Sequence, residues 1–358
     1  MKLRLDTSKT YAIALEGGGA KGAYEVGVWR ALDEVDVRFD AVAGTSVGAL
    51  NGAMMVMGEL EQALRLWENI RFSQVFDADD EQLKKLYDHK LSEVDFRTLF
   101  KDVMEAIHEG GLDIEPLRRL IAEWVDEEKI RSSPKKLFLV TYSLTDKREL
   151  DMDADELEEG KLRDMLLASA YVPLFQRKKL DGKDYVDGSV HNIVPISSLL
   201  ERGYRDIIVI RIFGVGFEKR TRIPEDANII TVAPREKLGG VLQFDAAQSR
   251  RLLQLGYFDG LRMLYGLAGE KYYIDRQWSE TEAYFALQEL CRLFIKEETP
   301  CLRALNETIL PKLAKHLKVK DGGYYDLLTA LLERLAERQG ISPFRVRTEE
   351  MLLLEIAA

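Results

Sequence analysis

The sequence has few cysteines and few histidines, and both shortages restrict the chemistry that it can perform. Two cysteines occur in 358 residues, Cys291 and Cys301. They have neither the number expected of a disulfide framework nor the spacing of metal ligands, which fits a reducing compartment. The four histidines are His89, His108, His191 and His316. A reaction that needs a catalytic histidine therefore has few candidates for it.

Positive charge and long apolar runs are scarce as well. The formal net charge is −10, and no run of lysines or arginines offers a surface for phosphates, so we expect no nucleic-acid partner. The first 19 residues lack the apolar core and the cleavage site of a signal peptide. The longest apolar run, residues 41–58, contains glycine, asparagine and hydroxyl residues, which favour a buried strand, turn and helix over a membrane span. We therefore predict a cytoplasmic protein. Export by a route that needs no N-terminal signal is left open.

The first part of the chain alternates strand-like and helix-like segments. Apolar runs predict strands at 11–15 and 39–44, and apolar residues at helical spacing predict helices at 20–35 and 46–57. This order, with its short connections, predicts parallel strands covered by helices, and hence an α/β fold.

The rest of the chain divides into a helical insertion, a return to strands and a helical end. Residues 59–130 are mostly amphipathic, and we expect them to form a helical cap over one end of the sheet. Further strands are expected at 135–144, 206–212 and 228–234, a helix at 161–170, and a short strand with a turn at 183–190. From about residue 246 the pattern is helical nearly throughout. We place a domain boundary near residue 270, giving a first domain over 1–270 and a helical region of unassigned role over 271–358.

A glycine-rich stretch, "LEGGGAKGAY" at 15–24, follows the first predicted strand. Gly17, Gly19 and Gly22 match G-x-G-x-x-G, the pattern of a dinucleotide-binding turn. That interpretation also needs an acidic residue at the end of the second strand, where this chain has "GTSVG" instead. A P-loop is excluded, because Ala23 and Tyr24 follow the last glycine in place of lysine and a hydroxyl residue. A bare loop of this kind could also receive a reacting carbonyl oxygen.

The second motif, "GTSVG" at 44–48, places Ser46 between a strand and a helix. G-x-S-x-G in that context predicts a nucleophile elbow, in which Gly44 and Gly48 allow a sharp, crowded turn. Alone, it could also be a tight turn for helix packing. Adjacent parallel strands would bring the elbow and the glycine loop to one edge of the sheet, where α/β proteins bind ligands. The glycine loop would then act as an oxyanion hole.

The third motif, "VDGSVHNIVP" at 186–195, offers two candidate bases for Ser46. Asp187 lies in an Asp-Gly turn after a strand-like segment and could point into the same crevice, although Asp-Gly pairs are usually simple turn formers. His191 follows four residues later, and we expect it at the rim of the site or on the surface. The other three histidines lie in polar helical segments and are expected on the surface.

Taken together, "GGGAKG", "GTSVG" and "DG", in this order, resemble the patatin-like phospholipase family over roughly residues 9–215. The segment "ASAYVPLF" (168–175) resembles a fourth stretch that lines the site in that family. The resemblance implies a three-layer α/β/α sandwich with a mainly parallel sheet. It also implies hydrolysis of acyl esters in phospholipids and related lipids by a serine–aspartate dyad, without catalytic histidine, metal or organic cofactor.

Carried over to this chain, the resemblance makes Ser46 the nucleophile and Asp187 the general base. The oxyanion hole would consist of the backbone amides of Gly17, Gly18 and Gly19. Lys21 would steady this loop or meet the lipid phosphate. The positions expected to support the site are Gly22, Gly44, Gly48, Pro173 and Gly188.

The third motif departs from the family pattern at two positions. Ser189 follows Asp187 and Gly188, where the family often has glycine or alanine. Ile193, and not asparagine, stands two residues before Pro195, while Asn192 is one position away.

Several alternatives stay open at this point. The same dyad could transfer the acyl group to another alcohol or lysolipid, the glycine loop could belong to a nucleotide-binding module, or the fold could be an inactive scaffold. Peripheral contact with a membrane is conceivable through 59–130 or 238–244, although core-facing helix is the plainer interpretation. The C-terminal residues 351–358 are expected to dock on their own domain or on a partner subunit of a homo-oligomer.

Overall fold

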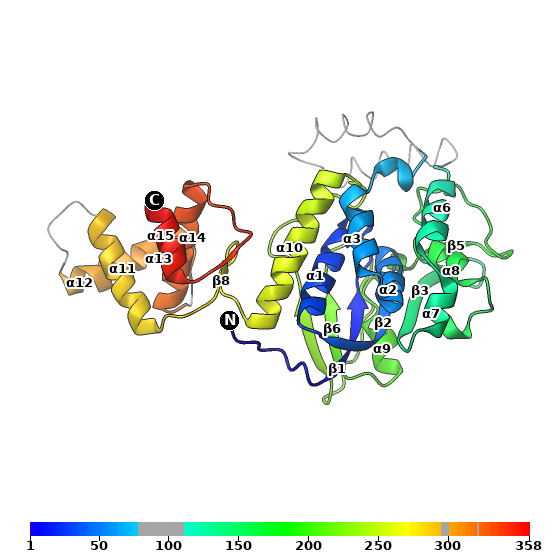
Figure 1. Cartoon of the computed structure of the whole chain (residues 1–358), viewed down its shortest axis with the longest axis horizontal. Helices are drawn as coiled ribbons and strands as arrows, with labels where there is room; N and C mark the ends of the chain where they lie inside the picture. Colours follow the sequence, from blue (N-terminus) through cyan, green and yellow to red (C-terminus); the bar gives the residue numbers. More distant parts are fainter. Residues whose placement is uncertain (78–110, 295–300, 321) are drawn as a thin grey trace. The chain divides into compact units, whose positions relative to one another are not determined.

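A computed structural model describes residues 1–77, 111–294, 301–320 and 322–358, which form two compact units (Figure 1). One unit comprises residues 6–260, and the other comprises residues 1–5 together with 261–358. Residues 78–110, which belong to the predicted helical cap, lie outside the described residues.

The larger unit is built on a seven-stranded, mainly parallel sheet with the order β4-β3-β2-β1-β6-β7, in which β5 pairs with β3. The strands are β1 (Thr10–Leu15), β2 (Arg38–Thr45), β3 (Lys136–Ser143), β4 (Arg148–Asp153), β5 (Tyr185–Asp187), β6 (Asp206–Ile210) and β7 (Asn228–Val232). Strands β4 and β5 are antiparallel to β3, and the other pairs are parallel. The predicted α/β fold with a mainly parallel sheet is confirmed.

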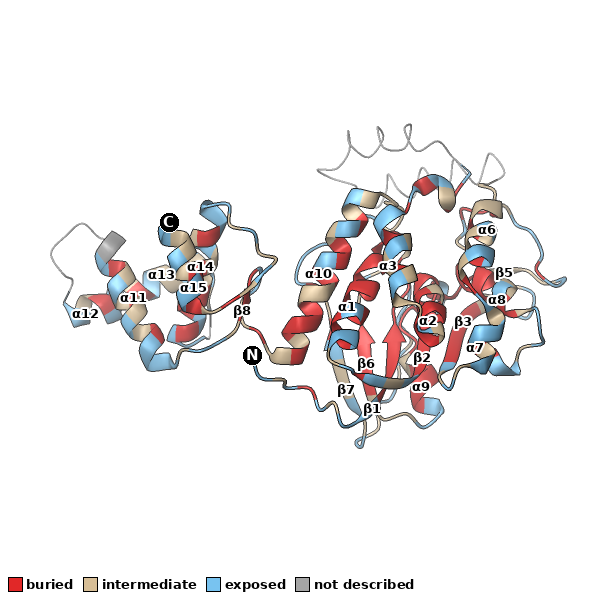
Figure 2. Cartoon of the chain, in the orientation of Figure 1, coloured by how far each residue is buried: buried red, intermediate tan, exposed pale blue. Residues whose placement is uncertain are grey.

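The central strand β1 is buried on both faces, because helices cover both sides of the sheet (Figure 2). On one face, Ala12 and Ala14 belong to an apolar cluster with Leu199 of α9 (Ile196–Glu201). On the other face, α2 (Val47–Met57) packs against β1, β2 and β3. A strand buried on both faces explains why the sequence there is a continuous apolar run.

The remaining helices of this unit surround the sheet and the site. The helix predicted at 20–35 begins with a 3-10 turn, η1 (Gly19–Gly22), and continues as α1 (Ala23–Glu34). The described parts of the predicted cap form α3 (Leu60–Asn69), α6 (Glu115–Trp124) and α7 (Glu127–Ser132). The described part of this unit also contains α8 (Leu162–Ser169) and, up to residue 260, α10 (Ala246–Tyr265).

Strand register brings three loops to one edge of the sheet. Leu15, the last residue of β1, pairs with Gly44 on β2 and with Ile210 on β6. The chain segments that follow these three parallel strands therefore start side by side, as predicted for the glycine loop and the elbow.

The smaller unit is mainly helical. Its larger elements are α11 (Glu280–Phe294), α13 (Leu310–Leu317), α14 (Tyr324–Arg338) and α15 (Glu349–Ala357). The pattern did not reveal the short parallel pair β8 (Tyr273–Ile274) and β9 (Val346–Arg347). Leu352 is buried in the core of this unit, so the C-terminal helix docks on its own unit. Among the helices that the structure describes, none is both long enough and apolar enough to cross a bilayer.

Candidate active site

Ser46 lies on a sharp turn between β2 and α2. Its φ of 57° and ψ of −125° are unusual for a residue with a side chain and indicate backbone strain. A Cβ on Gly44 would collide with the backbone of Gly48, and a Cβ on Gly48 would lie 2.6 Å from the Leu15 carbonyl oxygen. Both glycines are therefore required by the close approach of backbone around the elbow.

A second serine holds the elbow in place. The Ser46 N–H donates to Ser169 Oγ at 2.9 Å, and the Ser169 hydroxyl donates to the Val140 carbonyl oxygen at 2.6 Å. Ser169 is fully buried at the end of α8. It lies in the segment that resembles the fourth family stretch, but nothing in the sequence distinguished it from its neighbours.

The Ser46 hydroxyl donates to Asp187 Oδ2 at 2.5 Å. Asp187 ends β5, and its other carboxylate oxygen accepts the Ser189 N–H at 2.8 Å. Ser46 and Asp187 are only 6% and 3% exposed. The two residues predicted to react together are thus in direct contact in a largely dry environment.

Burial raises the pKa of Asp187 above its ordinary value, and the hydrogen bonds from Ser46 and Ser189 partly oppose this rise. A carboxylate with a raised pKa is a stronger base than an aspartate in water. Ser46 also lies at the N-terminus of α2, where the helix dipole favours developing negative charge. The surroundings of the pair therefore suit proton transfer from the hydroxyl to the carboxylate.

The glycine loop passes beside this pair. A Cβ on Gly17 would lie 2.5 Å from Ser189 Oγ, and one on Gly18 would lie 2.7 Å from Ile212 Cδ1. Gly19 has a φ of 56°, in the left-handed region that favours glycine. The Gly17 N–H donates to the Ile193 carbonyl oxygen at 2.9 Å. Of the three predicted oxyanion amides, those of Gly18 and Gly19 make no hydrogen bond with the described part of the chain.

An apolar cavity opens onto Ser46 and Gly19. Its walls include Leu66 and Trp67 of α3, Leu117 and Ile121 of α6, and Val241, Leu242 and Phe244. Phe76 and Phe175 stack within it, with 5.2 Å between ring centroids. The described parts of 59–130 and the segment 238–244, both considered at the sequence level as lipid-contacting surfaces, therefore form the walls of one cavity.

The model of the patatin-like phospholipase family matches residues 13–200, more than half of the chain. This span includes the glycine loop, the elbow, Asp187 and Ser169. The chain belongs to the patatin-like phospholipase family. The resemblance inferred from the motifs is confirmed.

Curated relatives match over short stretches. Patatin-like phospholipase domain-containing protein 6 of Mus musculus is 47% identical over 51 residues, which are 14% of this chain and 4% of the relative. Lysophospholipase nte1 of Aspergillus terreus is 46% identical over 46 residues, 13% of this chain and 3% of the relative. The chain thus spans a few per cent of the length of these relatives. Among solved structures, VipD from Legionella pneumophila matches with a TM-score of 0.45 and 13% identity, covering 92% of this chain and 85% of VipD.

The loop-supporting role considered for Lys21 agrees with its contacts in this patatin-like protein. Lys21 Nζ donates to the Phe213 carbonyl oxygen at 2.5 Å, and the side chain is 9% exposed. Burial lowers the pKa of Lys21, while the nearby Glu16 carboxylate opposes this change. Lys21 thus connects the glycine loop to the segment after β6.

Glu16, the residue before the glycines, forms a second connection that sequence analysis missed. Its carboxylate accepts the backbone N–H groups of Ile212 at 2.8 Å, Phe213 at 3.1 Å and Gly214 at 3.1 Å, and the Arg211 guanidinium at 2.9 Å. The motif contains this glutamate, but its partners are almost 200 residues away in the sequence. Glu16 and Lys21 together fix the segment 211–214 against the glycine loop.

The far end of the glycine loop rests on a buried polar network. Asn51 Nδ2 donates to the Gly22 carbonyl oxygen at 3.0 Å and to Glu25 Oε2 at 2.8 Å, and Trp67 Nε1 donates to Asn51 Oδ1 at 3.0 Å. Glu25 is fully buried, which raises its pKa well above the ordinary value. Because Asn51 and Trp67 also line the cavity, this network joins the cavity wall to the glycine loop.

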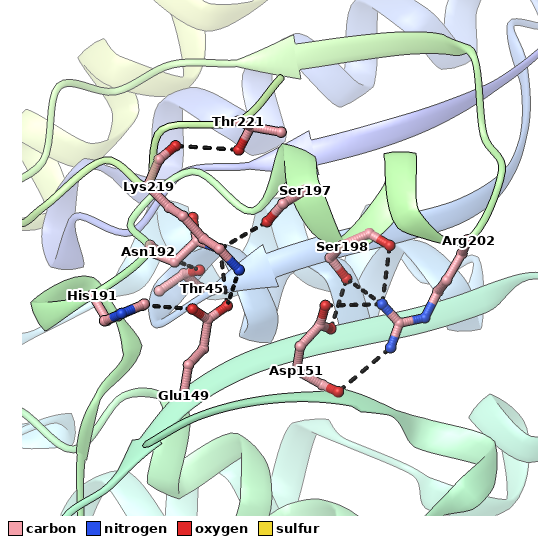
Figure 3. Close-up of polar contacts among 10 residues, drawn as sticks. All are labelled: Thr45, Glu149, Asp151, His191, Asn192, Ser197, Ser198, Arg202, Lys219 and Thr221. Atoms are coloured by element: carbon pink, nitrogen blue, oxygen red, sulfur yellow. Dashed lines mark hydrogen bonds and ion pairs between the residues drawn. The ribbon is translucent and has the colours of Figure 1, made fainter. Parts of the chain in front are cut away.

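The loop after Asp187 is braced by Asn192 (Figure 3). Thr45 Oγ1 donates to the Asn192 carbonyl oxygen at 2.8 Å, and Asn192 Nδ2 donates to Glu149 Oε1 and to Ser197 Oγ, both at 3.2 Å. The asparagine that departs from the family position by one residue therefore still connects this loop to the residue preceding Ser46.

The His191 side chain contacts Glu149. Its Nδ1 lies 2.5 Å from Glu149 Oε2 (Figure 3). The side chain is 46% exposed. No contact joins it to Ser46 or Asp187 within the described residues. This placement agrees with the expected position at the surface.

Two other predicted support residues lie in different surroundings. A Cβ on Gly188 would collide with the Val140 carbonyl oxygen, so glycine allows the Asp187 turn to pack against β3. Pro173 is exposed and lines a separate hollow with Tyr171 and Tyr185, not the cavity at Ser46. The structure therefore does not bring Pro173 against the reacting groups.

Proposed function

We propose that this protein hydrolyses acyl esters of phospholipids or related lipids through a covalent acyl-enzyme on Ser46. The observation that supports this most strongly is the 2.5 Å contact between the Ser46 hydroxyl and a buried Asp187 carboxylate at an apolar cavity. The apolar walls suit an acyl chain, whose burial is favourable by about 0.8 kcal/mol per methylene group.

In the first half-reaction, Ser46 Oγ attacks the carbonyl carbon of the ester while its proton passes to Asp187. The N–H groups of Gly18 and Gly19 donate to the oxyanion that forms, and each such donor contributes about 3–4 kcal/mol. We leave the Gly17 amide out of this role because it already donates to Ile193. Collapse of the intermediate breaks the ester bond, and the leaving alcohol or lysolipid takes the proton from Asp187.

In the second half-reaction, water attacks the acyl-enzyme. Asp187 accepts a proton from the water and returns it to Ser46 Oγ as the fatty acid leaves. The same groups thus act in both halves, and the pair is restored. Transfer of the acyl group to another alcohol would use identical steps with a different acceptor.

Hydrolysis of soluble p-nitrophenyl esters of medium-chain acids tests this proposal. We expect turnover by the parent protein and a loss of at least about 10³-fold in Ser46→Ala and Asp187→Asn. Ser249→Ala is the matched control, since Ser249 is a buried serine of α10 whose hydroxyl makes no hydrogen bond with a described residue.

Activity that survives Asp187→Asn but disappears in His191→Ala would show that a histidine is the base. An inert parent protein that also resists a fluorophosphonate probe would contradict the enzymatic proposal. With phospholipid substrates, the ratio of free fatty acid to acylated lysolipid acceptor separates hydrolysis from acyl transfer.

A further inference from the structure

The segment that follows β6, residues 212–217, has an unusual alternation of side chains. Ile212 is fully buried, and Gly214 and Gly216 alternate with Phe213, Val215 and Phe217. A surface segment whose side chains alternate between two sides usually places apolar residues inward and polar residues outward. Here the large apolar side chains are the exposed ones.

The glycines of this segment are required by contact with the site. A Cβ on Gly214 would collide with the Gly17 carbonyl oxygen, and one on Gly216 would collide with the Ser189 carbonyl oxygen. The Phe217 N–H donates to that same Ser189 oxygen at 2.8 Å. The inner side of the segment is therefore packed against both the glycine loop and the loop that follows Asp187.

The outer side presents a group of apolar side chains to solvent. Phe213 and Val215 are each 53% exposed, and Phe217 is 71% exposed. Val190, in the loop after Asp187, is 37% exposed. We call these four residues the apolar rim, because they belong to the segments that hold the Ser46–Asp187 pair.

Three basic residues, Lys219, Arg220 and Arg222, follow the apolar rim after Glu218, whose carboxylate lies 3.0 Å from the Arg211 guanidinium. Lys219 Nζ lies 3.4 Å from Glu149 Oε1, which connects the segment to the network around Asn192 (Figure 3). Arg220 and Arg222 are exposed and form no ion pair with any residue that the structure describes. In a chain with a formal net charge of −10, two exposed arginines without an ion pair among the described residues thus follow the exposed Phe217 by three and five positions.

We infer that the apolar rim inserts into a lipid surface that carries anionic headgroups, with Arg220 and Arg222 contacting those headgroups. Exposed aromatic and aliphatic side chains beside basic residues are the combination that partitions into the boundary of a charged bilayer. This inference rests on the proposed function for its biological reason, since a lipid hydrolase must meet its substrate at such a surface.

A second copy of the chain fits the apolar rim less well. A stable protein interface buries about 800 Å² on each partner. The four side chains of the rim are few compared with the roughly 20–30 residues that such an interface uses on each side. Insertion into a bilayer has no such requirement, because each apolar side chain that enters the lipid contributes separately.

The test is co-sedimentation with vesicles of phosphatidylcholine alone and of phosphatidylcholine with phosphatidylserine, using Ser46→Ala protein so that the lipid is not consumed. We expect binding to the mixed vesicles that weakens with added salt. In this background, Val215→Ser with Phe217→Ser should reduce partitioning by about tenfold or more. Arg220→Gln with Arg222→Gln should reduce it by about tenfold and remove the preference for the anionic vesicles.

Phe285→Ser is the matched control, because Phe285 is 57% exposed on α11 and lies outside this segment. Its vesicle binding should equal that of the Ser46→Ala parent. Equal binding by the Val215/Phe217 variant, or no binding by the parent, would overturn the inference. So would a result in which the Val215/Phe217 changes abolish self-association of the protein, measured by light scattering, and leave vesicle binding intact.

Hydrolysis of a soluble short-chain ester separates this inference from the proposed function. In a chain that retains Ser46, the Val215/Phe217 variant should hydrolyse the soluble ester at the parent rate and lose activity on vesicles. Rim-dependent vesicle binding by a protein with no esterase activity would contradict the proposed function and leave the lipid-binding surface standing. Esterase activity without vesicle binding would support the proposed function and contradict the lipid-binding surface.

Discussion

Asp187 in one compact unit and Glu349 in the other are buried carboxylates, and each accepts a hydrogen bond from a hydroxyl group. Asp187 accepts the Ser46 hydroxyl at 2.5 Å, and Glu349 accepts the Tyr325 hydroxyl at 2.7 Å. The carboxylates are 3% and 0% exposed. By distance and burial alone the pairs are nearly alike, so these two quantities do not identify an active site.

The surroundings of the two pairs differ. Ser46 is held on a strained turn and lines an apolar cavity, beside backbone amides that have no acceptor among the described residues. Tyr325 is 1% exposed, and the Arg276 guanidinium lies 3.8 Å from the centre of its ring. Glu349 also accepts the Gln277 N–H at 3.1 Å, which ties the start of α15 to the chain after β8. One pair has room for a reactant, and the other is part of a packed core.

The largest effect that we predict separates the two carboxylates by reactivity. Asp187→Asn should reduce labelling of Ser46 by a fluorophosphonate probe by at least about 10³-fold, because the proposed base for the hydroxyl is lost. Glu349→Gln makes the same chemical change in the other unit and should leave labelling unaltered. Mass spectrometry of the labelled peptide measures both. Equal loss in the two variants, or full labelling in Asp187→Asn, would contradict the distinction.

The pH dependence of hydrolysis sharpens the comparison next. Because burial raises the pKa of Asp187, its ionised form should appear only above the ordinary range of an aspartate, about 3.9. The rate on a soluble ester should therefore fall as pH decreases through that raised pKa. A midpoint at or below the ordinary value, with the protein still folded by circular dichroism, would contradict Asp187 as the base.

The pH dependence of stability tests the direction of the same pKa shift independently. A carboxyl group whose pKa is raised by folding favours the folded state below its unfolded pKa, and this contribution is lost as pH rises through the folded pKa. Above its folded pKa the ionised Asp187 thus costs stability. Asp187→Asn should melt at a higher temperature than the parent at neutral pH, and the difference should shrink in acid.

The elements that the sequence predicted best are those with a local signal. Strands β1, β2 and β6 are buried on both faces and therefore appear as apolar runs, and the two glycine motifs mark turns where backbone segments collide with any Cβ. Strand β4 was missed because "RELDMD" is largely charged, as an edge strand can be. Its Glu149 and Asp151 hold the Asp187 loop and α9 through Asn192 and Arg202 (Figure 3).

The parts of the site that could not be predicted depend on contacts between distant segments. The Glu16 carboxylate can accept the backbone N–H groups of residues 212–214 only because β6 lies beside β1, which brings these residues to the glycine loop. The Gly17 amide is occupied because Ile193 lies next to it, which no motif spacing reveals. The contact between Ser46 and Asp187 could be anticipated because both residues lie in local motifs, whereas the contacts that brace them join distant segments and could not.

The smallest predicted effect concerns the structural pair. Tyr325→Phe removes one hydrogen bond to a buried carboxylate that keeps the Gln277 N–H, so it should cost about 1–2 kcal/mol, or about 4–16 °C in the transition of the smaller unit. Tyr324→Phe, at the exposed neighbour, should change the melting temperature little. Neither should alter ester hydrolysis. A loss of ester hydrolysis in folded Tyr325→Phe protein would show that the hydroxyl–carboxylate pair of the smaller unit takes part in function. Access to a cavity would then not be what distinguishes the two pairs.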